Sequence, residues 1–158
     1  MNRREFFLVS LVFFILLGIF YLPYYKREGG IFFGTIQDIT NLYGFYPWDI
    51  LTTKEIKSGY FPLWNPHNAL GEPHLANLQS AVFYPLTWIK IFFGFLKSID
   101  WILLFRLYLA GVFTYLLLRS LGVSGWGSLF SGISFAFCGY FAKYIYMSHL
   151  NVEILLPL

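Results

Sequence analysis

The acidic residue best suited to a catalytic role in this chain is Asp38. It follows the long apolar run that ends near residue 25, and only one other carboxylate, Glu28, lies between them. A carboxylate a short distance above a membrane interface stays ionised in water while it reaches a lipid-linked substrate, which suits a general base or a metal-side ligand. Asp is also a favoured N-cap residue, so Asp38 could instead cap a segment that starts at Ile39. We take Asp38 as the candidate catalytic residue and keep the capping role as its alternative.

Two further acids lie in the same polar stretch. Asp49 falls in the first turn of a short helix predicted over 47–58, where the helix dipole favours a carboxylate. Glu72 lies in a turn between Gly71 and Pro73, where water could solvate it. Asp49 therefore has a structural explanation, and Glu72 is a candidate substrate-binding residue.

The informative cations are those inside apolar segments. Arg106 and Lys143 each interrupt one, and a charge at the centre of a membrane-spanning helix costs on the order of 3 kcal/mol. Both are expected near the outer ends of their segments, so they could extend to the interface or point inward and hold a phosphate. His149 follows on the same side. These three side chains are candidate substrate-binding residues.

The histidines do not form a recognisable metal motif. His67, His74 and His149 could be combined with Asp38 and Glu72 on paper, but no ligand spacing such as His-Glu-x-x-His is present. We therefore assign no metal ligand. The sequence indicates no particular cofactor, and the use of a divalent cation stays an open alternative. His74 remains a candidate for binding substrate.

Trp64 belongs to a group of loop aromatics that could stack on sugar rings. The same residue types are also common anchors at membrane interfaces, so both roles stay open. The other members of this group are Trp48, Phe83 and Tyr84.

Composition identifies the class of protein that must position these residues. Of the 158 residues, 58% are hydrophobic and 12% are charged, against about 25% charged in soluble domains. The net charge of +3 comes from scattered basic residues rather than a basic stripe, which excludes a nucleic-acid partner. The single cysteine, Cys138, cannot form an intrachain disulfide. The chain is predicted to be an integral membrane protein.

The first expected span covers 6–25, and Arg3 and Arg4 before it place the N-terminus in the cytoplasm. A large outer loop follows over 26–100. It is predicted to carry juxtamembrane helices at 47–58 and 81–96. The second of these is short for a span and contains Pro85 and Lys90, so we expect it to stay on the outer side. A full crossing is the alternative, and it would put the loop and His149 on opposite faces.

Two more spans are expected over 101–118 and 126–146, with a turn between them, and 147–158 begins a further outer element. The whole is an all-α membrane protein, a transmembrane helix bundle with one large loop. Because residues 153–158 run into a new apolar element without a stop signal, we expect a longer protein of which this is the N-terminal part.

Several loop motifs together resemble the first-loop signature of bacterial YfhO-type membrane proteins. The motifs are Phe45-Tyr46-Pro47-Trp48, Ser58-Gly59-Tyr60-Phe61-Pro62-Leu63-Trp64-Asn65-Pro66, Gly71-Glu72-Pro73, Ala76-Asn77-Leu78-Gln79-Ser80 and Phe83-Tyr84-Pro85-Leu86. Weaker matches continue along the helical segments to Leu156-Pro157-Leu158. The resemblance covers nearly the whole chain, and its specific part is the loop.

That family resembles the GT-C class of glycosyltransferases. The resemblance implies a polytopic enzyme that takes a sugar from a polyprenyl-phosphate carrier and adds it to a cell-envelope glycan or polymer on the outer membrane face. It also implies that Asp38 is the first-loop catalytic acid, although this chain has Gln37-Asp38 where members often have Gly-Asp. Since family members are much longer, this part alone is expected to be inactive. A non-catalytic role, as an assembly or partner-binding factor or a truncated fragment, is the alternative.

Overall fold

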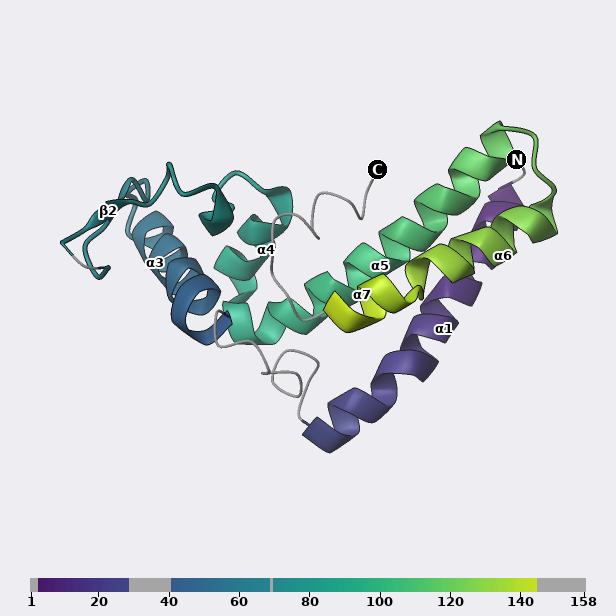
Figure 1. Cartoon of the computed structure of the whole chain (residues 1–158), viewed down its shortest axis with the longest axis horizontal. Coiled ribbons are helices and arrows are strands. Elements are labelled where there is room, and N and C mark those ends of the chain that lie inside the picture. Colours follow the sequence, from purple (N-terminus) through teal and green to yellow (C-terminus); the bar gives the residue numbers. More distant parts are fainter. Residues whose placement is uncertain (1–2, 29–40, 69, 145–158) are drawn as a thin grey trace.

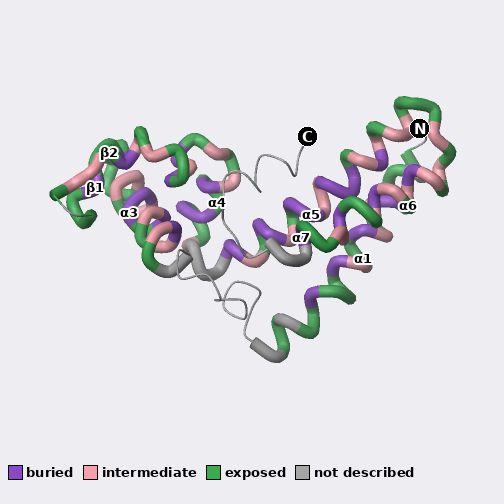
Figure 2. Tube along the Cα trace, in the orientation of Figure 1, coloured by how far each residue is buried: buried purple, intermediate pink, exposed green. Residues whose placement is uncertain are grey.

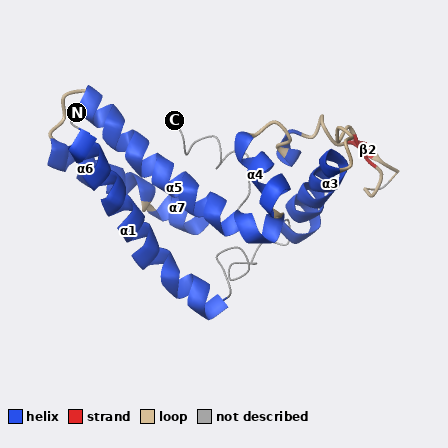
Figure 3. Cartoon of the chain, turned by 180° about the vertical axis from the view of Figure 1, so that it is seen from behind, coloured by secondary structure: helices blue, strands red, loops and turns tan. Residues whose placement is uncertain are grey.

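The structure is a computed structural model that describes residues 3–28, 41–68 and 70–144, and it is mostly helical (Figures 1 and 3). The helices are α1 (Arg3–Glu28), α3 (Tyr46–Lys57), α4 (Pro85–Phe93), α5 (Phe95–Ser120), α6 (Gly125–Ala136) and α7 (Gly139–Tyr144). A π-helical turn η1 (Asn41–Phe45) precedes α3, and a 3₁₀ turn η2 (Leu78–Ser80) precedes α4. The strands β1 (Trp64–Asn65) and β2 (Glu72–Pro73) form a small antiparallel hairpin.

Among the described residues, two helices are long and apolar enough to cross a membrane. The qualifying segments are Arg3–Pro23 in α1, with 21 residues, and Ser98–Ser120 in α5, with 23. At about 1.5 Å per residue, each exceeds the roughly 30 Å thickness of a bilayer core. They contain most of the predicted spans 6–25 and 101–118. Much of α1 is exposed along its length (Figure 2), as expected for a helix that faces lipid.

α1 and α5 run antiparallel, and a polar cluster joins the start of one to the end of the other. Oε1 of Glu5 accepts a hydrogen bond of 2.6 Å from the hydroxyl of Tyr115 and lies 3.1 Å from Nε of Arg119. Nη1 of Arg119 also donates to the carbonyl of Val123, which closes the turn into α6. The start of α1 and the turn after α5 therefore lie at one end of the molecule, and α3 and α4 lie at the other (Figure 1).

The three helices α1, α5 and α6 pack closely because Gly111 of α5 and Gly132 of α6 leave room for the ring of Phe13. Phe13 of α1 is completely buried. A Cβ placed on Gly111 of α5 would lie 2.3 Å from Cε1 of Phe13, and one on Gly132 of α6 would lie 2.8 Å from the carbonyl oxygen of Gly111. Small residues of this kind let membrane helices approach closely.

The segment predicted as a third span, 126–146, is divided in the structure. α6 has 12 residues and α7 has 6, with Phe137 and Cys138 between them. Phe141 of α7 packs in the same buried cluster as Leu103 of α5. A helix of 12 residues is about 18 Å long, so α6 alone is shorter than a bilayer core. Residues 145 and 146 lie outside the described range, and crossing by this segment stays a prediction.

Local sequence signals explain α3, which closely follows the helix predicted over 47–58. Pro47 occupies its first turn, where a missing amide hydrogen costs nothing. Gly59, at φ 82°, donates its amide hydrogen to Ile56, and Tyr60 donates to Glu55. This pair of bonds is a Schellman motif, which requires a left-handed residue such as glycine.

The element predicted over 81–96 is shorter and differently bounded. α4 has nine residues and is about 14 Å long, so this helix does not reach across a bilayer core. Ala81 ends the preceding 3₁₀ turn with φ 50°. At the other end Gly94, with φ 84°, is the only residue between α4 and α5. The helix that carries the second candidate span therefore starts at Phe95 rather than Trp101.

Candidate functional site

The described loop is organised around a buried ion pair between α3 and α4. Nζ of Lys90 donates hydrogen bonds of 3.1 and 3.0 Å to the two carboxylate oxygens of Asp49. Each side chain is only 7% exposed. Asp49 comes from the first turn of α3 and Lys90 from the last turn of α4, so the pair holds the two helices together.

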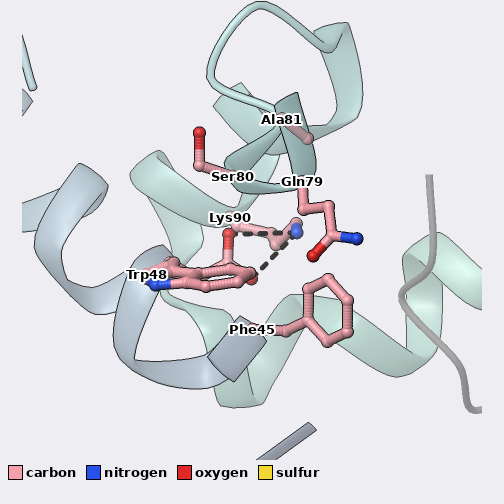
Figure 4. A pocket seen from close by; sticks show the side chains of 7 residues that line it. Phe45, Trp48, Gln79, Ser80, Ala81 and Lys90 are labelled. Carbon is pink, nitrogen blue, oxygen red and sulfur yellow. Dashed lines mark hydrogen bonds and ion pairs between the residues drawn. The ribbon is translucent and has the colours of Figure 1, made fainter. Parts of the chain in front are cut away.

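A pocket lies over this pair (Figure 4). Phe45 and Trp48 form its aromatic side, with ring centroids 5.5 Å apart in an edge-to-face arrangement. Gln79, Ser80 and Ala81 from the 3₁₀ turn complete the lining. The pocket therefore combines an aromatic wall, an amide and a buried pair of charges, which are groups that recognise polar ligands.

Burial raises the pKa of the Asp49 carboxyl above its ordinary value of 3.8, and the neighbouring Lys90 ammonium opposes that rise. Both carboxylate oxygens already accept hydrogen bonds from Lys90. In this conformation the pair acts as a clamp between helices, and neither group faces open solvent as a free base.

His74, a candidate substrate-binding residue, lies inside the protein. Its ring is completely buried, and Nε2 shares a hydrogen bond of 2.9 Å with Oγ1 of Thr52 on α3. Desolvation lowers the pKa of His74 below 6.5, while the charge of Glu72 opposes that shift. The hydroxyl of Ser80 donates to the His74 carbonyl at 3.1 Å. His74 thus ties the loop to α3, and direct contact with a substrate would require the loop to open.

Glu72 and Trp64, two further candidates, lie together in the β1–β2 hairpin. Oε1 of Glu72 accepts hydrogen bonds from the side-chain amides of Asn65 at 3.3 Å and Asn68 at 2.9 Å. Glu72 is therefore bonded within the hairpin and is not simply solvated. The indole of Trp64 lies over Gly71 and remains about half exposed, so its outer face can contact a ligand or partner.

Arg106 is buried within the candidate span of α5, with 3% of the residue exposed. It lies on the helical face that carries Leu103 and Ala110, which belong to the buried cluster shared with α1 and α7. Of the two alternatives for this side chain, the structure favours the inward-facing one. Arg106 follows Ser98 by eight positions, so it lies about 12 Å along the helix from the α4 end of the span.

The remaining candidates cannot be placed. Asp38 and His149 lie outside the described residues, and the side chain of Lys143 in α7 is also not described. Their assigned roles stay predictions. Within residues 3–28, 41–68 and 70–144, the structure brings His74 and Glu72 into one loop unit but keeps Arg106 apart in α5. No group of three potential metal ligands lies together in those ranges.

The sequence does not predict the Asp49–Lys90 ion pair that defines the site. In the sequence the helix dipole alone accounts for Asp49, and Lys90 only argues against a full crossing of its segment. A signal was present, because an isolated lysine in an apolar helix needs an acid partner. Nothing local, however, indicated that the partner was Asp49 rather than another loop acid.

Comparison of the chain with protein-family models, with curated proteins and with solved structures finds no match.

Proposed function

We propose that this chain is the N-terminal part of a polytopic membrane glycosyltransferase of the GT-C type. The observation that carries the proposal is the buried Arg106 inside a candidate membrane span. Ionisable side chains inside membrane spans mark the pathways of charged substrates in many membrane proteins. The loop motifs described above support the same assignment.

In the proposed reaction, an acceptor hydroxyl attacks the anomeric carbon of a sugar carried on polyprenyl phosphate. The new glycosidic bond forms as the bond from that carbon to the phosphate oxygen breaks. Asp38 takes the proton from the acceptor, and the polyprenyl phosphate leaves with the bonding electrons. Arg106, Lys143 and His149 neutralise the departing phosphate. The acceptor is a cell-envelope glycan or polymer on the outer face, and the protein is a multi-pass membrane protein with a cytoplasmic N-terminus.

The test uses the full-length protein in membrane vesicles supplied with a polyprenyl-phosphate sugar. Asp38→Asn should reduce transfer by about 10² to 10⁴-fold, since a general base contributes that much. Asp38→Glu should retain part of the activity. Glu55→Gln, which changes an acid of α3 outside the proposed site, is the matched control. Full transfer by a normally expressed Asp38→Asn variant would contradict the catalytic assignment.

A second candidate function is a non-catalytic one, in which the loop binds a partner protein. Its support is that several polar groups of the loop bond with one another. The pairs are Asp49 with Lys90, His74 with Thr52, and Glu72 with Asn65 and Asn68. This function predicts that Asp38→Asn and Arg106→Gln keep biological activity while substitution of the exposed Trp64 abolishes it.

A further inference from the structure

α4 has an inverted distribution of polar and apolar side chains. Its buried residues are Thr87, Lys90 and Ile91, so two of the three are polar, whereas its opposite face consists of large apolar side chains. Phe92 is 75% exposed and Phe93 is 71% exposed. Trp88 and Ile89 belong to the same outward face, one helical turn earlier. In a helix that faces water, the charged residue would point outward and the phenylalanines inward.

The polar side chains of α4 are bonded within the protein. Lys90 donates hydrogen bonds to Asp49, and Oγ1 of Thr87 donates a hydrogen bond of 2.9 Å to the carbonyl oxygen of Ala81. The outward face, defined here as Trp88, Ile89, Phe92 and Phe93, contains no charge. This inversion therefore follows from specific contacts that neutralise the inner side of the helix.

α3, the partner of α4, shows the ordinary distribution. Apart from the clamped Asp49 it buries Leu51 and Thr52, and it exposes Lys54 and Lys57 beside a single large apolar side chain, Ile50. The two helices clamped by the ion pair thus present opposite surfaces. One outer surface is suited to water and the other to an apolar medium.

α4 leads almost directly into the helix that carries a candidate membrane span. Only Gly94 separates α4 from α5, and the span in α5 begins four residues later, at Ser98. Trp101 and Phe105, near the start of that span, are also exposed. Tryptophan and other aromatic residues are typical of the layer where a bilayer meets water.

We propose that the outward face of α4 is a membrane-binding surface whose occupant is bilayer lipid, with α4 in the interfacial layer and α3 on its watery side. This differs from the sequence-based expectation that both loop helices lie against the membrane. The assignment rests on burial and continuity in α4 and α5, and it is independent of sugar transfer.

Site-directed spin labelling of the full chain in phosphatidylcholine and phosphatidylglycerol vesicles tests this proposal. Single cysteines are introduced at Phe92 and Phe93 in a Cys138→Ser background. Phe14, exposed in the candidate span of α1, supplies the lipid reference, and Leu70, fully exposed beside the hairpin, supplies the water reference. Collision rates are measured with oxygen, which concentrates in lipid, and with a nickel chelate, which stays in water.

We expect the oxygen-to-nickel ratio at both α4 positions to approach that at Phe14 and to exceed that at Leu70 several-fold. A ratio equal to that at Leu70 would overturn the proposal, because the face would then be in water. Low collision rates with both reagents would also overturn it, since another protein surface would cover the helix.

A charge substitution gives a second readout that does not depend on labels. Phe92→Glu should lower the yield of folded protein in membranes several-fold, whereas Leu70→Glu should leave it unchanged. Both side chains are exposed in the isolated chain, so the protein would tolerate both substitutions equally if both positions faced water. Equal yields for the two variants would therefore count against lipid contact.

Discussion

Asp49 and Lys90 are 41 positions apart in the chain, yet Nζ of Lys90 contacts both oxygens of the Asp49 carboxylate. The contact decides how the loop is built, because it fixes α3 against α4 and lets the apolar face of α4 point outward. A buried pair of this kind costs desolvation energy and is tolerated only when its geometry is good. Its value here lies in the specific arrangement of two short helices.

Removing one partner of this pair should be far more harmful than removing both. Lys90→Met leaves the Asp49 charge buried without compensation, which costs about 3–5 kcal/mol in comparable pairs. The double variant Asp49→Leu/Lys90→Met should recover most of that stability. Equilibrium unfolding in detergent micelles measures both, with Lys54→Met on the exposed face of α3 as control. Equal loss in the single and double variants would show that the pair does not set the packing.

The stability of the loop should fall as the pH is lowered through the range in which His74 titrates. Because the folded state lowers the pKa of His74 from 6.5, folding favours the neutral ring. Its contribution is complete above pH 6.5 and is lost as the pH falls through the folded-state pKa. Hydrogen exchange of residues 72–80, measured between neutral and acidic pH, follows this change.

His74→Gln should remove that pH dependence, because glutamine can share the hydrogen bond with Thr52 but does not titrate. His67→Gln, at an exposed position of the same loop, is the matched control and should leave it intact. An unchanged pH profile in His74→Gln would assign the effect to another group.

Alanine substitutions at two loop glycines, Gly59 and Gly71, can distinguish the cost of backbone strain from the cost of a steric clash. Alanine at Gly59, with φ 82° and open space around it, should cost about 1–2 kcal/mol from the left-handed conformation alone. Alanine at Gly71, with φ 98°, should cost more, since its Cβ would lie 2.6 Å from the indole of Trp64. Thermal unfolding compares the variants. Adding Trp64→Ala should bring the cost of Gly71→Ala close to that of Gly59→Ala, and failure to do so would exclude the steric explanation.

The packing of Phe13 against Gly111 should show strong coupling. Gly111→Ala is expected to destabilise the chain by about 1–3 kcal/mol, because its Cβ would overlap the Phe13 ring. Gly18→Ala, at an open position of α1, should be neutral or stabilising. In a Phe13→Ala background, Gly111→Ala should cost clearly less. Additive effects in this double-mutant cycle would contradict close contact between the two residues.

The antiparallel arrangement of α1 and α5 predicts that the hairpin and the α5–α6 turn lie on opposite sides of the membrane. Single cysteines at Leu70 and Leu121, both exposed, are introduced with Cys138→Ser and treated with a membrane-impermeant maleimide on intact cells. Only the Leu70 position should react if the N-terminus is cytoplasmic. Labelling of both positions would exclude this topology. His74 is unsuitable as a probe because its side chain is buried.

The features that the sequence predicted well are those with local causes. A long uncharged run predicts a helix like α1, since only a helix satisfies its backbone in lipid. Pro47 and Gly59 influence the backbone within one turn of their own positions. The observed bounds of α3 therefore differ from the predicted ones by only one residue at each end. The break between α6 and α7 was missed because Phe137 and Cys138 carry no helix-breaking signal.

The sequence by itself determined an apolar, helical chain with a loop rich in proline and aromatics. It predicted three spans, and among the described residues the structure contains two helices long and apolar enough to cross a membrane. Only the tertiary structure decided which polar groups meet. Lys90 forms an ion pair with Asp49, and His74 shares a hydrogen bond with Thr52. Phe13 packs against glycines of two other helices. The physical reason is that burial of a charge or a ring depends on surfaces supplied by distant segments, whereas hydropathy and turn propensity belong to each segment alone.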